Sequence, residues 1–477
     1  MIIRVDKCHT FGMKKSATSS VQYNPMILVN RERIPPIELG KSFVYLGKQF
    51  NHGMKIDDIK EELKNDNLKY VTTIDRLPLN ALNKTSIIQK YVFSKYRWLF
   101  TIYDLSETWV VENIDNVIGK YLRKWLQLPV SANISHLSFT TRKLGINFTF
   151  AKEVYQKCKL SLRRILKLSK NREIRRLYSV TSGNHIRSDS IINNVVSKNG
   201  ELNLKQVASK SDQLYNKREI DEKWNNFMKL NEQNIIIDHI LSVCCSKVIA
   251  MWQSLIQRLP DNIFSFVRKA LIFSLPNKSN LFRWKLVDSS SCSMCNQGAE
   301  TQLHIFSNCC KYLDRYLWRH NSVLHTIVNK LSRATCDNVK VYADLPDSNY
   351  SCTSDLFMDQ RPDIAIKLNG DLIIIELTVC FDTNTHKSRS YKEDRYNKLK
   401  ENLRNPCNSF EILYVEITTL GFISTVSYRP FCKLLKKLGI NDDRTISKCM
   451  ETAIRGTYFV FCRRNKQWEV TDLLNFY

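Results

Sequence analysis

The feature that most constrains this fold is an Asn-Gly pair, Asn369-Gly370, set between two apolar runs rich in isoleucine. Asn-Gly in that setting is the strongest short-range signal of a two-residue β-hairpin. The sequence therefore predicts a strand over residues 364–368 and a second over residues 371–379.

Two acidic residues accompany the predicted hairpin. Asp363 precedes the first run, and Glu376 lies within the second among isoleucine and leucine residues. A buried charge is costly unless it is paired or binds a metal. With lysines following at Lys387, Lys392 and Lys398, we predict a nuclease centre with Asp363 and Glu376 as Mg²⁺ ligands. The alternatives are a strand-end turn aspartate and solvent-exposed helix lysines.

The sequence after the hairpin predicts an α/β core. Apolar spacing predicts helices over residues 385–403, 428–438 and 444–456, with a strand over residues 410–417 between the first two. A strand joined to the hairpin through a helix predicts a mixed sheet.

Composition narrows the class of partner. The chain of 477 residues carries 72 Lys and Arg against 46 Asp and Glu, a formal charge of +26. Such a balance favours a nucleic-acid partner and is not explained by a purely structural scaffold. The apolar run at residues 235–252 contains charged residues and predicts a buried helix, so no membrane partner is expected.

Upstream of the hairpin, residues 1–50 predict short strands and residues 51–178 predict helices. The basic, amphipathic segment 157–176 predicts either a solvated helix face or a helix that contacts phosphates. Residues 179–215 are polar and predict a linker or a mobile segment. The candidate phosphate contacts are Arg163, Arg164, Lys167, Arg175 and Arg176.

A cysteine cluster predicts a metal site. Cys292, Cys295, His304 and Cys309 follow the pattern C-x2-C-x8-H-x4-C, which suits a structural zinc ion with four protein ligands. The alternatives are four ordinary buried residues, or Cys310 in place of Cys309. The odd total of 15 cysteines without a secretory signal predicts reduced thiols.

Together these motifs resemble the C-terminal half of a non-LTR retrotransposon polyprotein, of the subgroup with a restriction-like endonuclease that inserts into ribosomal RNA genes. The resemblance covers about residues 280–400, and weaker matches lie upstream. The matching residues are Cys292, Cys295, Glu300-Thr301, His304, Cys309, Arg319-His320, Arg361-Pro362-Asp363, Glu376-Leu377-Thr378-Val379 and Lys392-Glu393-Asp394-Arg395-Tyr396. The upstream matches are Lys7-Cys8-His9-Thr10-Phe11, Tyr45-Leu46-Gly47, Leu77-Pro78, Lys95-Tyr96-Arg97, Arg123-Lys124-Trp125-Leu126-Gln127-Leu128-Pro129 and Leu144-Gly145.

The resemblance implies a multidomain nuclear protein that nicks target DNA for target-primed integration and binds element RNA. It places the catalytic lysine at Lys392, because Thr378 stands where restriction enzymes carry one. Further nucleic-acid contacts are implied at Arg319, His320, Arg395 and Tyr396. The implied domains are a distal palm remnant (1–50), a helical thumb-like domain (51–178), a linker and helical region (179–280), a CCHC zinc knuckle region (281–335) and a restriction-like endonuclease domain (336–477).

Departures from the family limit these expectations. The chain contains no Tyr-x-Asp-Asp, so we expect the upstream polymerase portion to be missing and no reverse transcription by this chain alone. Asn321 stands where some relatives have Asp. A decayed or co-opted fragment that binds nucleic acid without catalysis is the alternative. The presence of both Asp363 and Glu376 favours the enzyme.

Overall fold

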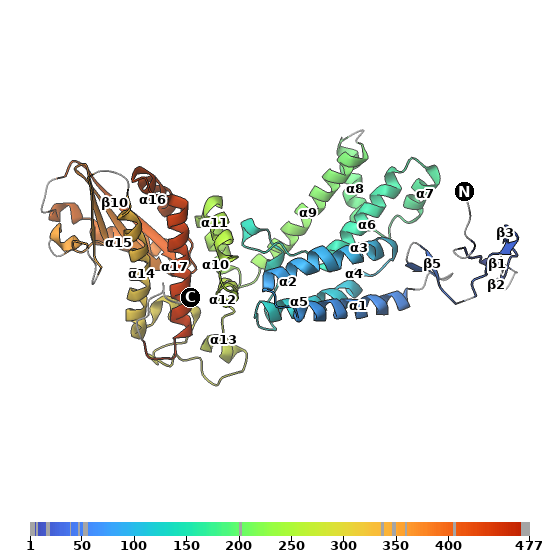
Figure 1. Ribbon diagram of the computed structural model, residues 1–477, viewed down its shortest axis with the longest axis horizontal. Helices are drawn as coiled ribbons and strands as arrows, with labels where there is room; N and C mark the ends of the chain where they lie inside the picture. The colour runs from blue at the N-terminus through green and yellow to red at the C-terminus, as the bar shows by residue number, and fades with distance from the viewer. Residues whose placement is uncertain are drawn as a thin grey trace.

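The computed structural model shows an elongated molecule, with a helical part beside a part that contains the main sheet (Figure 1). The N-terminal strands lie at the end of the helical part that is remote from this sheet. The predicted landmarks at Lys7, Leu46 and Gly47 lie outside the described residues. The described residues are 5, 8–15, 20–38, 40–45, 48–50, 56–199, 203–334, 338–345, 350–357, 360–403 and 407–468.

The N-terminal segment forms short antiparallel strand pairs, as predicted. The pairs are β1 (Gly12–Lys15) with β2 (Ser20–Tyr23), β3 (Leu28–Val29) with β4 (Glu32–Arg33), and β5 (Phe43–Tyr45) with β6 (Lys48–Phe50).

The helical part packs around one apolar core. Ile88, Phe100 and Ile114 are completely buried in it. Its elements are α1 (Asp57–Asp75), α2 (Ala81–Ile87), η2 (Ile88–Val92), α3 (Phe93–Ile102), α4 (Glu107–Val110), η3 (Val111–Asp115), α5 (Asn116–Trp125), η4 (Ser135–Ser138), η5 (Thr141–Lys143) and α6 (Ala151–Leu168).

The predicted linker at residues 179–215 is wrong, because most of this segment is helical. It contains the end of α7 (Arg172–Val180), all of α8 (Ile186–Asn199) and part of α9 (Leu204–Met228). Ile191 and Ile192 of α8 are buried against Leu160 of α6 and Tyr215 of α9. Burial of these few apolar side chains stabilises helices whose remaining residues are polar.

A second group of helices joins the two parts. Its members are α10 (Ile235–Val243), α11 (Ser246–Ile256), α12 (Asp261–Leu271) and α13 (Lys278–Arg283). The single helix predicted over residues 235–252 is thus two helices, with extended backbone at Cys244 between them. The buried Trp252 stacks on Phe422 with ring centroids 4.3 Å apart and donates a hydrogen bond to the Leu420 carbonyl. In the described part of the chain, no helix has the length and apolar character needed to cross a membrane.

The C-terminal part contains a four-stranded mixed sheet in the order β10-β9-β8-β7. The predicted hairpin is confirmed: β8 and β9 are antiparallel, and Asn369 and Gly370 both have positive φ, at 53° and 88°. The mixed character is also confirmed, because β10 runs parallel to β9. The strands are β7 (Val339–Ala343), β8 (Ile364–Leu368), β9 (Asp371–Cys380) and β10 (Phe410–Thr418).

Helices cover both faces of this sheet. Ile373 and Ile375 of β9 point into the main core, where α14 and α17 pack, whereas Ile374 lies under Tyr396 and Leu399 on the other face. Side chains alternate along a strand, so Glu376 lies on the face of Ile374. The helical elements are α14 (Leu313–Leu331), α15 (Thr385–Tyr396), η9 (Leu399–Asn402), α16 (Thr425–Lys437) and α17 (Asp442–Cys462), with η8 (Thr353–Asp355) before the hairpin.

Candidate metal centre and acidic cluster

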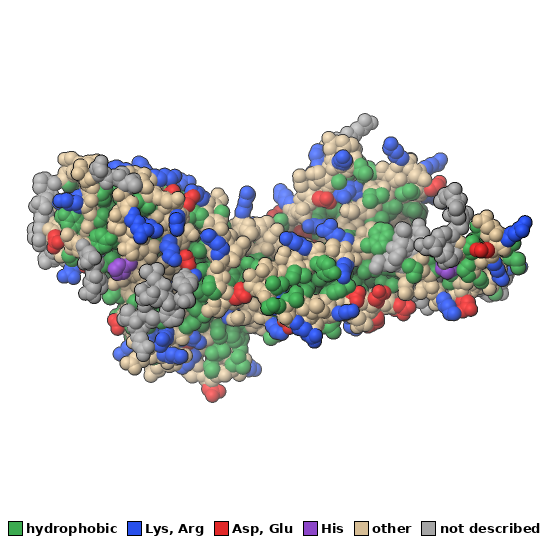
Figure 2. All heavy atoms as spheres, viewed as in Figure 1, with side chains coloured by type: hydrophobic (Ala, Val, Ile, Leu, Met, Phe, Trp, Pro, Cys, Tyr) green, Lys and Arg blue, Asp and Glu red, His purple; other side chains and the backbone are tan. Residues whose placement is uncertain are grey.

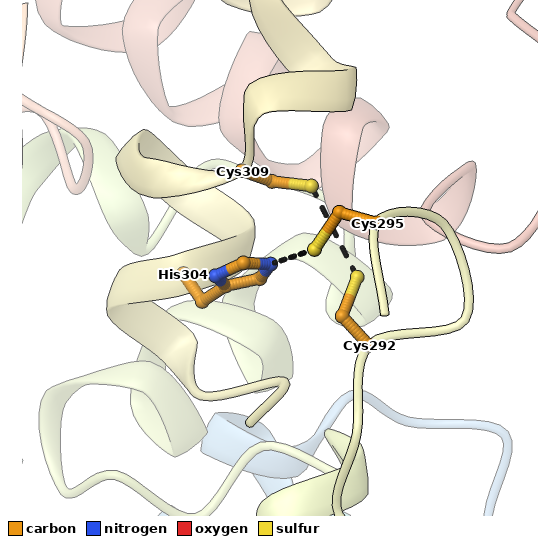
Figure 3. Close-up of side chains that lie close together, drawn as sticks. All are labelled: Cys292, Cys295, His304 and Cys309. Atoms are coloured by element: carbon orange, nitrogen blue, oxygen red, sulfur yellow. Dashed lines mark hydrogen bonds between the residues drawn. The ribbon is translucent and has the colours of Figure 1, made fainter. Parts of the chain in front are cut away.

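The four residues of the cysteine cluster converge, as their spacing predicts. Cys292 and Cys295 lie on the loop after α13, His304 begins η6 (His304–Asn308), and Cys309 follows it directly before η7 (Cys310–Tyr312) (Figure 3). Their ligand atoms all lie within 4.8 Å of one another. Among the described residues, no other group of three or more His, Cys, Asp or Glu side chains converges in this way.

The distances suit a tetrahedral ion. Cys292 Sγ lies 4.0 Å from Cys309 Sγ, and Cys295 Sγ lies 3.4 Å from His304 Nε2. Zinc bonds of about 2.3 Å to sulfur and about 2.1 Å to nitrogen place tetrahedral ligand atoms about 3.5–3.8 Å apart. The cluster could therefore hold a metal ion with only small side-chain adjustments.

Backbone hydrogen bonds hold the ligands in place. The Cys292 N–H donates to the Gly298 carbonyl at 2.9 Å, which closes the loop that carries both of the first two cysteines. The Cys309 N–H donates to the Tyr316 hydroxyl at 3.1 Å, and that hydroxyl donates to the His304 carbonyl at 3.0 Å. Tyr316 of α14 thus ties the second half of the cluster to the sheet-containing part.

The structure decides between the two adjacent cysteines. Cys309 is 1% exposed and faces the cluster, whereas Cys310 is exposed and its thiol donates to Gln297 Oε1. Burial raises the pKa of the Cys309 thiol to about 12. Because a bound cation favours the thiolate, a metal ion would offset that burial.

The hairpin brings the two predicted acids together at one end of the sheet. Ile364 pairs with Ile375, so Asp363 stands opposite Glu376. The Asp363 N–H donates to Glu376 Oε1 at 3.2 Å, and Asp363 Oδ2 accepts from the Leu377 N–H at 2.8 Å. Each carboxylate is therefore fixed by the backbone next to the other.

Lys392 is the lysine that reaches these acids. Its Nζ lies 2.7 Å from Glu376 Oε2 and 3.4 Å from Asp363 Oδ2. Lys392 projects from α15, which covers the face of the sheet that carries Glu376. Lys387 and Lys398 are exposed, and among the described lysines only Lys392 forms ion pairs with the two acids.

His320 is a fourth member of this group, and the sequence did not place it there. From α14, its Nε2 lies 3.5 Å from Asp363 Oδ2 and 3.2 Å from the Leu377 carbonyl. Residue 320 precedes Asp363 by a long stretch of chain, and only the Arg319-His320 motif pointed to it. We call His320, Asp363, Glu376 and Lys392 the acidic cluster.

The charges in the acidic cluster are strongly coupled. Burial, reinforced by the charge of Asp363, raises the pKa of Glu376 to about 7. Burial also disfavours ionised Asp363, but His320 and Lys392 outweigh it and hold its pKa below the usual value. Burial opposes charge on Lys392 and on His320, yet the neighbouring carboxylates raise the pKa of both.

Two of the basic residues predicted to contact phosphate are buried in ion pairs instead. Arg163 Nε donates to Asp189 Oδ1 at 2.8 Å, and the Arg163 side chain is 1% exposed. Arg164 NH1 donates to Asp212 Oδ1 at 2.9 Å. Their guanidinium groups are therefore engaged within the protein.

Two further predicted contacts also lie in the interior. Arg319, 1% exposed, donates to the Phe306 carbonyl at 2.9 Å and to Thr457 Oγ1 at 3.1 Å, and its burial lowers its pKa to about 10. Tyr396 is 3% exposed and donates to the Arg361 carbonyl at 3.2 Å. Both positions support the fold around the two sites.

The remaining predicted contacts reach the surface. Arg175, Arg176 and Arg395 are exposed, and Lys167 is half-buried with its Nζ donating to Asn193 Oδ1. Figure 2 shows Lys and Arg side chains on the surface of both the helical and the sheet-containing parts.

A comparison with known protein families finds no match for this chain, and a comparison with curated proteins finds none either.

Proposed function

We propose that the acidic cluster is the active site of a metal-dependent DNA endonuclease. The chain would be the endonuclease and nucleic-acid-binding portion of a non-LTR retrotransposon protein, acting in the nucleus on target DNA with element RNA as a further partner. The observation that carries this proposal is the convergence of Asp363, Glu376 and Lys392 at one end of a mixed sheet.

The donor set fits a divalent cation. Two carboxylates share the single ammonium of Lys392, and the pKa of Glu376 is raised to about 7 because burial and Asp363 oppose its charge. A cation bound by Asp363 and Glu376 would relieve that repulsion, and Mg²⁺ prefers such oxygen ligands. The raised pKa of Glu376 supports a metal site more strongly than the presence of acidic residues alone.

The residues have separable roles in phosphodiester hydrolysis. When bound, the metal would polarise the scissile phosphate and acidify a water molecule. Lys392 would donate a hydrogen bond to the phosphate and neutralise charge that develops there. His320 would hold the Asp363 carboxylate in its orientation, since its Nε2 lies 3.5 Å from Oδ2.

We further propose the domain roles that the family resemblance implies. The helical elements within residues 51–178 would serve as the thumb-like domain, and the cysteine cluster as the zinc knuckle. Packing supports one change of boundary: α14 contacts α17 and β9, so it belongs with the endonuclease domain rather than with the knuckle region.

Plasmid nicking tests the proposal. The full chain should convert supercoiled DNA to the nicked form with Mg²⁺ and not with EDTA. Asp363→Asn and Glu376→Gln should each lower the nicking rate by at least about 100-fold. The matched control is Asp394→Asn, an exposed acid on α15. Full activity of Asp363→Asn, with its fold intact by circular dichroism, would overturn the proposal.

The zinc assignment has its own test. The purified chain should contain one equivalent of zinc, and Cys295→Ser should lose it because three protein ligands remain. Cys310→Ser is the matched control, since that thiol faces away from the cluster. Zinc retained by Cys295→Ser and lost from Cys310→Ser would show that the ligand set is different.

A further inference from the structure

A large basic groove lies on a face of α14 different from the one that bears the acidic cluster. It has a volume of about 1300 Å³ and is formed by α11, α14 and α17. Its residues on α14 are Ser322, His325, Thr326, Asn329 and Lys330, whereas His320 points to Asp363. Two residues along a helix correspond to a rotation of about 200°, so groove and cluster occupy separate surfaces.

The groove holds more cations than its acids can neutralise. Of its two acids, Glu451 pairs with Lys448 at 3.3 Å and with Arg455 at 2.8 Å, and Asp443 pairs with Lys247 at 2.7 Å. Those contacts leave four further cations with no carboxylate partner among the described residues. They are Arg258, Lys330, Arg333 and Arg444.

These four cations come from three different elements. Arg258 follows α11, Lys330 lies in the last turn of α14 with Arg333 just after the helix, and Arg444 lies in the first turn of α17. Each element therefore brings positive charge to the same groove. Mutual repulsion among them is offset when an anion with several charges binds.

The size of the groove favours a polymer over a small ligand. Pockets for small molecules typically measure about 300–1,000 Å³, and this groove exceeds that range. No Phe, Tyr or Trp lines it among the described residues. An occupant would therefore be held through its charged backbone and not by stacking of bases.

The width of the groove favours one strand over two. Both α11 and α14 pack on α17, which forms the floor between them. Packed helices lie about 8–10 Å apart, so the axes of α11 and α14 are separated by at most about 20 Å. Subtracting the two half-helices leaves at most about 10 Å. A DNA duplex is wider than its major groove alone, which already measures about 12 Å, so the space accepts a single strand more readily than a duplex.

We propose that this groove binds the phosphate backbone of single-stranded nucleic acid, independently of base sequence. Arginine supplies three of the four unpaired cations, and its fork matches phosphate oxygens. The inference does not require the acidic cluster to be catalytic, because the groove lies on another surface and its test measures binding alone.

The test measures the affinity of the full chain for fluorescent oligonucleotides without Mg²⁺. Arg258→Gln, Lys330→Gln and Arg444→Gln together should weaken binding of a single strand by about 10-fold or more near 0.1 M salt. The slope of log affinity against log salt should become less steep by about 2, because each phosphate contact to a single strand contributes about 0.7. Oligo-dT, oligo-dA and oligo-U should lose affinity alike.

The matched control removes the same charge elsewhere. Lys69, Lys90 and Lys120 are exposed lysines of the helical part, and changing all three to Gln should leave the affinity within about twofold. An equal loss in both triple variants would overturn the groove assignment. The proposal would also be overturned by a competitor that binds as tightly as the single strand and loses affinity equally in the groove variant. The competitors to compare are blunt duplex DNA, polyglutamate and a mononucleotide. Unchanged unfolding midpoints confirm that both variants are folded.

Discussion

Two buried ion clusters in this molecule differ in charge balance. In the helical part, Arg163 meets Asp189 through two parallel hydrogen bonds of 2.8 Å, and its other donors reach the Tyr178 carbonyl and Thr181 Oγ1. One cation thus meets one anion, and each of the three guanidinium nitrogens donates at least one hydrogen bond. Such a saturated pair holds α6 and α8 together and has no unmet need for a ligand.

The acidic cluster is unsaturated by comparison. Lys392 is shared between Asp363 and Glu376, and the pKa of Glu376 is raised to about 7. Its charges are balanced only when Glu376 is protonated, when His320 is charged, or when a cation binds. The difference teaches that burial of charge alone does not mark a candidate functional site, and that a buried acid with a raised pKa is the more informative signal.

The largest expected effect comes from breaking the saturated pair. Asp189→Ala should lower the free energy of unfolding of the helical part by about 3–5 kcal/mol, because Arg163 would remain buried without a partner. Urea denaturation, monitored by circular dichroism, measures the free energy of unfolding. The double variant Arg163→Met, Asp189→Leu should recover most of the loss, and nicking by the folded protein should be unchanged in it. A loss below about 1 kcal/mol in Asp189→Ala would contradict the structural role.

Removal of the shared cation should act on catalysis. Lys392→Met should lower the nicking rate by about 10²–10³-fold, because the developing charge on the phosphate loses its partner. Steady-state nicking of supercoiled DNA measures the effect. Lys387→Met and Lys398→Met are the controls, since both side chains are exposed on or near α15. Equal losses in all three variants would indicate a general charge effect.

The unbalanced charge of the acidic cluster also predicts that the free energy of unfolding, measured in EDTA, depends on pH. Glu376 has a folded-state pKa of about 7, above the ordinary glutamate value of 4.5. The stability that its protonated form contributes is therefore fully present below about pH 4.5 and is lost as the pH rises through 7. Relative to Glu376→Gln, the unaltered chain should lose about 2–3 kcal/mol between pH 4.5 and 8. A flat difference between the two unfolding free energies would contradict an unbalanced cluster.

Local signals in the sequence predicted much of both candidate sites. The Asn369-Gly370 turn fixes the register that places Asp363 opposite Glu376, and the spacing of the four zinc-type ligands is short enough to close one site. These features depend on residues near one another in the chain. The assignment of the catalytic lysine instead needed the family resemblance, and the position of Lys392 agrees with it.

Features set by distant contacts escaped prediction. Asp189 lies 26 residues beyond Arg163, and Asp212 lies 48 residues beyond Arg164, so amphipathic spacing could not reveal that these arginines are paired. The polar character of residues 179–215 likewise concealed α8, whose burial depends on α6 and α9. Charge patterns predict which helix face is polar, and they do not show which other element covers it.

The smallest expected effect separates the two kinds of cation within the segment that was predicted to bind phosphate. Arg175 and Arg176 of α7 are exposed and make only local contacts. Arg175 donates to the Ser169 and Lys170 carbonyls, and Arg176 pairs with Glu173. Changing both to Gln should lower nucleic-acid affinity by less than about 10-fold and make the salt slope less steep by about 1–2.

That double variant should leave the unfolding free energy within about 0.5 kcal/mol, because exposed positions carry little stability. Asp189→Ala should show the reverse pattern, with a large loss of stability and no change in the salt slope of the folded protein. If the arginines of α7 altered stability and not affinity, the exposed cations would be structural as well. The saturated pair would then no longer differ in kind from its exposed neighbours, and nucleic-acid binding by this segment would be excluded.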